Sequence, residues 1–154
     1  MIKTFWLACV CLLSLGIVTN SFAQEPEVET LLNSGFDLLS AGDVAGARHV
    51  FIQVVQQDSG NIDALQGLAS CLYLRNDYPR ARRTISIITH RQPEHAYASG
   101  LLGTIEYQEG NMGEAEAALL DAVRLNDDNS SFYNNLAVVL LAQGKRDEAM
   151  ELLK

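Results

Sequence analysis

The sequence predicts an all-α solenoid built from stacked pairs of short helices. The first observation is a period: one pattern of residue types recurs at a constant interval between Val28 and Lys154, without insertion or deletion. The second is the spacing of Leu65, Leu68 and Leu72, which places apolar side chains on one helix face. The third is a turn residue that recurs at the same place and is always of a type that tolerates positive φ. Helix pairs this short bury their apolar faces only by stacking on further copies.

Counting from Val28 divides the chain into three complete units and a fourth that is cut short, at residues 28–61, 62–95, 96–129 and 130–154. The turn inside each unit falls at Gly42, Asn76, Gly110 and Gly144. Small residues recur where the two helices of a unit should touch, and they form the repeat signature: Gly35, Ala47, Ala69, Ala81, Gly103, Ala115, Ala137 and Ala149. Small side chains at these positions let two helices approach closely.

The period, of about 34 residues, and its small residues resemble the tetratricopeptide repeat. The match is closest at Tyr-Asn-Asn-Leu-Ala (133–137) followed by Gln-Gly-Lys (143–145), and from Leu68-Ala69 to Pro93. The resemblance covers residues 28–154 and implies a right-handed superhelical solenoid of helix-turn-helix units. It also implies a non-catalytic scaffold that binds another protein, as a peptide segment or a helix, in a concave groove lined by the first helices.

Residues 1–23 have the features of a secretory signal peptide. Lys3 supplies a positive charge, an apolar run covers residues 5–18, and small residues precede a cleavage point before Gln24. We therefore expect an exported protein, in the periplasm of a bacterium; the alternative is an uncleaved signal that anchors the chain in the inner membrane. Residues 24–27 are interpreted as an acidic N-terminal arm or first cap.

The third unit departs most from the repeat pattern. Glu106 stands where the other units carry a leucine, namely Leu38, Leu72 and Leu140. We expect a small helix rotation to leave Glu106 in solvent; the alternative is a buried charge that marks a site. Asn111 and Glu114 have the spacing of a capping pair for the second helix of this unit.

Charge is uneven along the chain, which carries a net charge of −8. The negative total argues against nucleic acid as a partner. Five arginines gather in the second unit: Arg75, Arg80, Arg82, Arg83 and Arg91. The third unit is acidic, so we expect its second helix to pair with the second helix of the unit before it. The alternative is an anion-binding patch at Arg80 and Arg83, which are one helical turn apart.

The sequence contains no recognisable catalytic constellation, and we expect neither an enzyme nor a cofactor. His90 and His95 lie five residues apart, which is not the helical spacing of a shared metal, so no metal site is expected. No glycine-rich phosphate loop or nucleophile motif is present. Cys71, the one thiol outside the signal, neighbours Leu68 and Leu72 and is interpreted as a small buried side chain.

The resemblance places the candidate binding groove on the first helices. Its predicted lining is Leu32, Phe36, Gln66, Ser70, Tyr73, Tyr97, Thr104, Tyr107, Asn134 and Val138. This set contains aromatic and amide side chains but no Lys or Arg, which disfavours the carboxylate-gripping chaperone-binding branch of the family. It suits an apolar or aromatic segment. The alternative is that the apolar members, with Leu39 and Leu141, are ordinary core.

Two other function classes are compatible with the residues. The open fourth unit could dock on another chain, giving self-association through an oligomerisation module. The repeats could also be the recognition region of a larger enzyme that continues beyond Lys154. By analogy with exported proteins of this type, the expected process is pilus, secretion or outer-membrane assembly.

Overall fold

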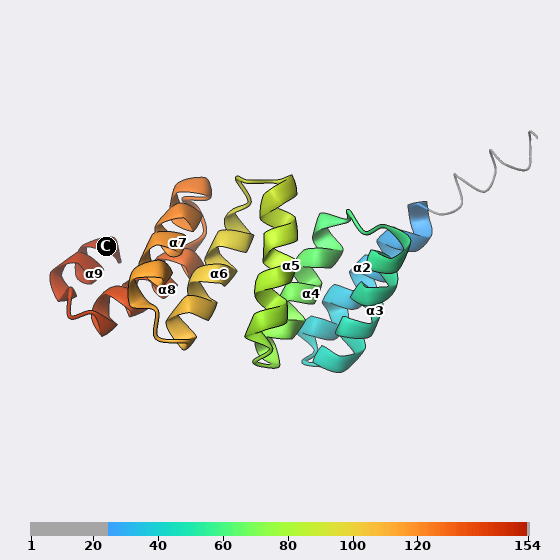
Figure 1. Cartoon of the computed structure of the whole chain (residues 1–154), viewed down its shortest axis with the longest axis horizontal. Helices are drawn as coiled ribbons and strands as arrows, with labels where there is room; N and C mark the ends of the chain where they lie inside the picture. Colours follow the sequence, from blue (N-terminus) through green and yellow to red (C-terminus); the bar gives the residue numbers. More distant parts are fainter. Residues whose placement is uncertain (1–24, 154) are drawn as a thin grey trace, which may run out of the picture.

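The computed structural model describes residues 25–153, and these fold as helices joined by short turns (Figure 1). Within this range there are eight helices: α2 (Glu25–Ser40), α3 (Val44–Gln57), α4 (Ile62–Leu74), α5 (Tyr78–Arg91), α6 (Ala96–Gln108), α7 (Met112–Leu125), α8 (Ser130–Ala142) and α9 (Arg146–Leu152). The predicted all-α fold of helix-turn-helix units is confirmed. The proposed signal peptide lies outside the described residues, and residues 25–27 of the proposed arm belong to the first turn of α2. Of the helices described, none combines the length and apolar character needed to cross a membrane.

The helices stand in a row along the long axis of the molecule, from α2 at one end to α9 at the other (Figure 1). Each unit is a contacting pair: α2 with α3, α4 with α5, α6 with α7, and α8 with α9. The first helices also contact one another, α2 with α4, α4 with α6 and α6 with α8. These four helices therefore form one continuous face of the solenoid.

The turns inside the units have the backbone that their sequence predicts. Asn76 has φ 57°, and Gly42, Gly110 and Gly144 have φ between 81° and 84°. This left-handed conformation lets the chain leave one helix and enter the next within three residues. It recurs once in each unit, so the four units share one turn geometry.

The signature residues lie where helices touch. The alanines at positions 47, 69, 81, 115, 137 and 149 are all buried. A Cβ atom on Gly103 would lie 2.6 Å from Leu119 Cγ, so only hydrogen fits there. In the first unit the ring of Phe51 is fully buried and fills the space beside Gly35 and Gly67. Aromatic bulk is thus accommodated by glycine on the two helices that face it.

Most helices begin with a side chain that accepts a hydrogen bond from a backbone N–H, as helix capping requires. Asp43, Asn61, Asp77 and Asn129 do this for α3, α4, α5 and α8. His95 caps α6 in the same way, its Nδ1 accepting from the Ala98 N–H at 3.2 Å. No local sequence pattern marks a histidine as a helix cap, since the preferred residues are Ser, Thr, Asp and Asn. The imidazole takes the place that Asn61 and Asn129 hold in the second and fourth units.

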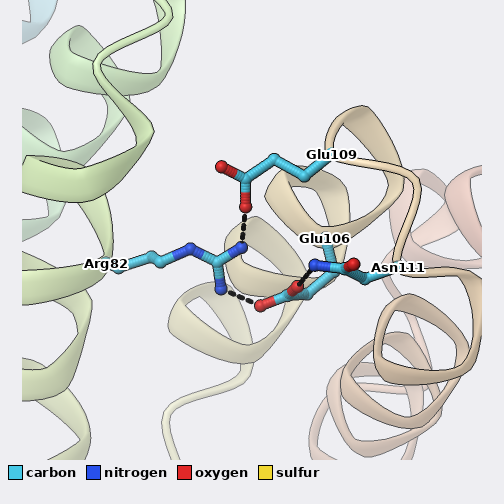
Figure 2. Close-up of polar contacts among 4 residues, drawn as sticks. All are labelled: Arg82, Glu106, Glu109 and Asn111. Carbon is cyan, nitrogen blue, oxygen red and sulfur yellow. Dashed lines mark hydrogen bonds and ion pairs between the residues drawn. The ribbon is translucent and has the colours of Figure 1, made fainter.

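The third unit differs from its predicted structure at Glu106 and Asn111 (Figure 2). Glu106 is buried, so the expectation that it faces solvent is wrong. Its carboxylate accepts hydrogen bonds from Arg82 of α5 and, at 2.8 Å, from the side-chain amide of Asn111. Asn111 makes no side-chain cap on α7 and instead holds Glu106, which also corrects the predicted capping pair. Burial of the charge is possible because two partners reach it from other segments.

The ion pairs between units also differ from the expectation. Arg82 of α5 bridges Glu106 and Glu109, which lie at the end of the first helix of the next unit (Figure 2). Among the described residues, Arg82 on the second helix of its unit therefore pairs with carboxylates at the end of α6 and not with those of α7. Lys145 pairs with Glu116 at 2.8 Å and links the fourth unit to α7.

Candidate functional site: a groove along the first helices

Two adjoining cavities form a groove between α4, α6 and α8. The larger, of about 420 Å³, is lined by Tyr73, Leu74, Tyr97, Gly100, Leu101, Thr104, Asn129, Ser131, Phe132 and Asn135. The smaller, of about 220 Å³, is lined by Tyr73, Thr104, Tyr107, Gln108, Leu119, Asn135, Val138 and Val139. Tyr73, Thr104 and Asn135 line both cavities, so the two form one continuous depression.

Five of the predicted groove residues come together in these cavities. Tyr73, Tyr97, Thr104, Tyr107 and Val138 all contribute to the lining. They come from three successive first helices, which the repeat brings side by side. The structure thus assembles the centre of the predicted set into one surface.

The other predicted residues lie elsewhere. Leu32 and Phe36 pack on the core of the first unit, and the Phe36 ring contacts that of Phe51 edge-on with centroids 5.0 Å apart. Both are half-buried against that core. Neither Gln66 nor Ser70 lines the groove, although the buried Ser70 contacts Tyr97, which does. Asn134 lines a separate cavity near the end of α9.

Sequence reasoning missed Asn135 and Phe132, which both line the groove. Asn135 is next to the predicted Asn134, so an error of one residue in helix phase accounts for it. Phe132 sits against Gly100 of the preceding unit, where a Cβ atom would lie 2.5 Å from its ring. The pairing of a phenylalanine with a glycine of the preceding unit was the available signal.

Hydrogen bonds between hydroxyl and amide side chains at the groove link the helices that form it. Ser70 Oγ donates to the Gln66 carbonyl at 2.8 Å, so Tyr97 Oη, 2.7 Å from Ser70 Oγ, is the donor of the bond between them. Asn135 Nδ2 donates to Thr104 Oγ1 at 3.3 Å, joining α8 to α6. Burial raises the pKa of Tyr97, against the opposing effect of the Ser70 hydrogen bond. Tyr97 is therefore neutral and serves as a hydrogen-bonding group.

The groove is apolar with neutral polar groups at fixed points. Of the described residues, none that lines either cavity carries a charge. Leu74 and Val138 expose about half of their surface, at 53% and 46%. The Asn135 side chain keeps a carbonyl oxygen and a second N–H available beyond its bond to Thr104. This combination can bury apolar side chains and bond a peptide backbone at the same time.

Groups that could support chemistry are not gathered anywhere in the described part of the chain. No three His, Cys, Asp or Glu side chains of residues 25–153 are arranged to hold a metal ion. Cys71 is buried, which raises its thiol pKa to about 11, while the positive charge of Arg48 acts in the opposite direction. Hydrogen bonds from Lys145 and then Gln143 lower the pKa of Glu116, which keeps this surface carboxylate ionised.

Comparison with known protein families identifies the repeat. A tetratricopeptide repeat model matches residues 38–105, and a second tetratricopeptide repeat model matches residues 131–154. Together the two matches span more than half of the chain. No curated protein matches the sequence.

Solved structures share the fold at low sequence identity. A thermophilic TPR protein of Thermus thermophilus superposes with a TM-score of 0.73 at 20% identity, over 82% of this chain and 71% of that one. MamA of Desulfovibrio magneticus gives a TM-score of 0.70 at 21% identity, over 84% of this chain and 73% of its own. The first TPR domain of Spaghetti (RPAP3), bound to an HSP90 peptide, gives 0.68 at 15% identity, over 76% and 93%. At these identities the likeness concerns the fold.

Proposed function

Because the chain belongs to the tetratricopeptide repeat family of protein-protein interaction modules, we propose that it is a non-catalytic scaffold whose groove binds an extended segment of a partner protein. The observation that carries the proposal is the continuous, uncharged groove between α4, α6 and α8. A related fold is known with a peptide bound, in the Spaghetti domain.

The lining indicates what kind of segment would bind. Tyr73, Tyr97 and Tyr107, which are all half-buried, offer rigid aromatic area at low entropy cost. Asn135 would bond the backbone of the segment and fix its register. An acidic tail would find no cationic partner among the described residues that line the groove. The proposed ligand is therefore a segment with aromatic or aliphatic side chains.

The experiment is to select peptides from a library displayed on phage and to measure the affinity of a selected synthetic peptide by fluorescence polarisation. Val138→Asp places a charge in the groove, and we expect at least about tenfold weaker binding. Leu120→Asp is the matched control, because Leu120 is equally exposed, at 51%, but lies on α7 outside the groove. We expect peptides rich in aromatic and aliphatic residues, with unchanged binding to the control.

Either of two results would overturn the proposal that the groove binds the peptide. The first is equal loss of binding in both variants, which would point to a general effect of negative charge. The second is full binding by Val138→Asp with its helical content intact by circular dichroism. Peptides selected for acidic residues would argue against the proposed ligand class and for a different surface.

The N-terminal residues carry a proposal about where the scaffold works. We propose export to the bacterial envelope with removal of residues 1–23, and a role there in pilus, secretion or outer-membrane assembly. The support is the charged, apolar and small-residue pattern of this segment. N-terminal sequencing of the protein from expressing cells tests it. A chain that begins at Gln24 supports cleavage, an intact chain in the membrane fraction favours an anchor, and an intact chain in the cytosol overturns export.

A further inference from the structure

A separate pocket lies where α3, α4 and α5 meet. It has a volume of about 240 Å³ and is lined by Arg48, Ile52, Leu68, Leu72, Arg80, Arg83 and Thr84. These residues come from α3, α4 and α5, and none of them lines the groove. Three arginines thus share the lining with three aliphatic residues and Thr84. In a chain of net charge −8, this is a marked local excess of positive charge.

The repeat itself shows what such a position can bind. Arg48 is the counterpart of Arg82 in the following unit, and Leu72 is the counterpart of Glu106. Between the second and third units, Arg82 donates to the Glu106 carboxylate (Figure 2). Between the first and second units, the same arginine position faces leucine. The carboxylate that completes the later site is missing from the earlier one.

The arginines of the pocket are mostly without internal partners. Arg48 and Arg83 have no acidic partner among residues 25–153, whereas Arg80 pairs with Asp77 at 3.3 Å. Asp77 is the one carboxylate engaged there, and its other oxygen accepts from the Arg80 backbone N–H. Its charge is therefore balanced locally by Arg80. The positive charges of Arg48 and Arg83 are left to attract an outside anion.

We propose that this pocket binds an acidic side chain of a partner protein, presented next to an apolar residue. The carboxylate would accept hydrogen bonds from Arg48 and Arg83, as the carboxylate of Glu106 accepts one from Arg82 in the next unit. The neighbouring apolar side chain would cover Ile52, Leu68 and Leu72. The interaction is independent of the groove and lies on a different face.

Size and charge select this occupant over others. The pocket is smaller than the about 300–1,000 Å³ that cofactor and small-molecule sites occupy, and it suits one or two side chains. The acidic surface of the rest of the chain would oppose approach to a nucleic acid or to an anionic membrane. A segment with a few carboxylates separated by apolar residues fits the volume of the pocket. Because it carries few charges, it is also repelled less by the acidic surface.

The test measures binding of a fluorescein-labelled peptide in which glutamate and leucine alternate, beside the same peptide with glutamine in place of glutamate. We expect the glutamate peptide to bind at least about tenfold more tightly, with an affinity that falls as salt increases. The variant Arg48→Gln/Arg83→Gln should weaken that binding by a similar factor. The control Arg75→Gln/Arg91→Gln makes the same change of net charge at arginines outside the pocket and should leave the affinity unchanged.

A second variant uses the repeat directly. Leu72→Glu gives the pocket its own carboxylate, at the position that Glu106 occupies in the next unit. If it folds, shown by circular dichroism, it should lose the glutamate peptide as the double arginine variant does. If it does not fold, the double arginine variant and its control decide the question.

Three results would overturn the proposal. Equal affinity for the glutamate and glutamine peptides, or equal loss in both double-arginine variants, removes the role of the pocket arginines. Inorganic phosphate and vesicles of phosphatidylglycerol are tested in parallel. If either binds with the same dependence on Arg48 and Arg83 while the glutamate peptide does not bind, the pocket takes phosphate and the acidic-segment proposal fails.

Discussion

The junction of the first and second units and the junction of the second and third units fill one repeat geometry in two ways. In the first junction, between α3 and α4, the fully buried ring of Phe51 meets Gly67. In the second, between α5 and α6, the same two positions are Ile85 and Leu101. One large side chain opposite a glycine is thus replaced by two side chains of medium size.

The two junctions also differ in polarity. Arg48 of the first junction faces Leu72, and it has no acidic partner among the described residues. Arg82 of the second junction holds Glu106 and Glu109 (Figure 2). The difference teaches that a solenoid position can be apolar in one unit and charged in the next, provided that the neighbouring helix supplies the partner. A repeat with an arginine and no partner is then a place where an outside carboxylate can bind.

The largest expected loss of stability comes from removing the large side chain that fills the first junction. Phe51→Ala removes a fully buried ring and should lower the free energy of unfolding by about 3–5 kcal/mol. Urea denaturation followed by circular dichroism measures it. Leu120→Ala is the control, since Leu120 is half exposed and should change stability by no more than about 0.5 kcal/mol. A loss below about 1 kcal/mol for Phe51→Ala would mean that the first junction does not depend on this ring.

The second junction should be destabilised by removing the arginine that pairs with its buried carboxylate. Arg82→Ala leaves the buried carboxylate of Glu106 with Asn111 alone, and we expect a loss of about 2 kcal/mol. Arg48→Ala is the matched control at the same repeat position and should cost less than about 0.5 kcal/mol, because it breaks no ion pair among the described residues. Glu106→Leu, which restores the leucine of the other units, should cost less than Arg82→Ala since no buried charge remains. Equal losses for Arg82→Ala and Arg48→Ala would refute the difference between the junctions.

The turns offer a smaller test of the shared geometry. Gly110 has φ 84°, so Gly110→Val should cost about 1–2 kcal/mol through a strained left-handed backbone. Gly110→Asn should cost clearly less, because Asn76 already adopts φ 57° at the equivalent place in the second unit. Thermal unfolding of the two variants side by side measures the difference. Equal melting temperatures would show that the turn of the third unit relaxes to another conformation.

The sequence was sufficient for the parts of the molecule that repeat. The turn residues and the buried alanines recur at fixed intervals, and period alone places them on helices and turns. Glu106 could not be placed in this way, because its burial depends on Arg82, which is 24 residues earlier in the chain and on a different helix. Asn111 had two competing uses, as a helix cap and as a partner of Glu106. A local pattern does not decide between them.

Five of the ten predicted groove residues line the two cavities, and the other five do not. Tyr73, Thr104 and Tyr107 follow from the face that the first helices share. The choice of Asn134 instead of Asn135 shows the limit of helix phase, since one residue corresponds to a rotation of about 100°. The exclusion of Phe36 from the groove depends on its contact with Phe51, which is a tertiary fact. Phase and tertiary packing together decide which face an apolar residue serves.

Cys71 can report local opening of the first junction, because this buried thiol belongs to the same core cluster as Phe51. Burial raises its pKa to about 11, from an ordinary value of 9.0, so the native thiol should resist alkylation at pH 8. Because the thiolate is disfavoured only in the folded state, folding stability should be unaffected by this group below pH 9 and should fall as pH rises from 9 towards 11.

The rate of alkylation of Cys71 by iodoacetamide, followed by mass spectrometry under native conditions, therefore reports opening of the first junction. Phe51→Ala should raise this rate strongly. Arg82→Ala should raise it only as far as it lowers global stability, if the two junctions open independently. If Arg82→Ala exposes Cys71 as much as Phe51→Ala does at equal global stability, the solenoid opens as one unit. The contrast between its junctions would then concern composition and not local stability.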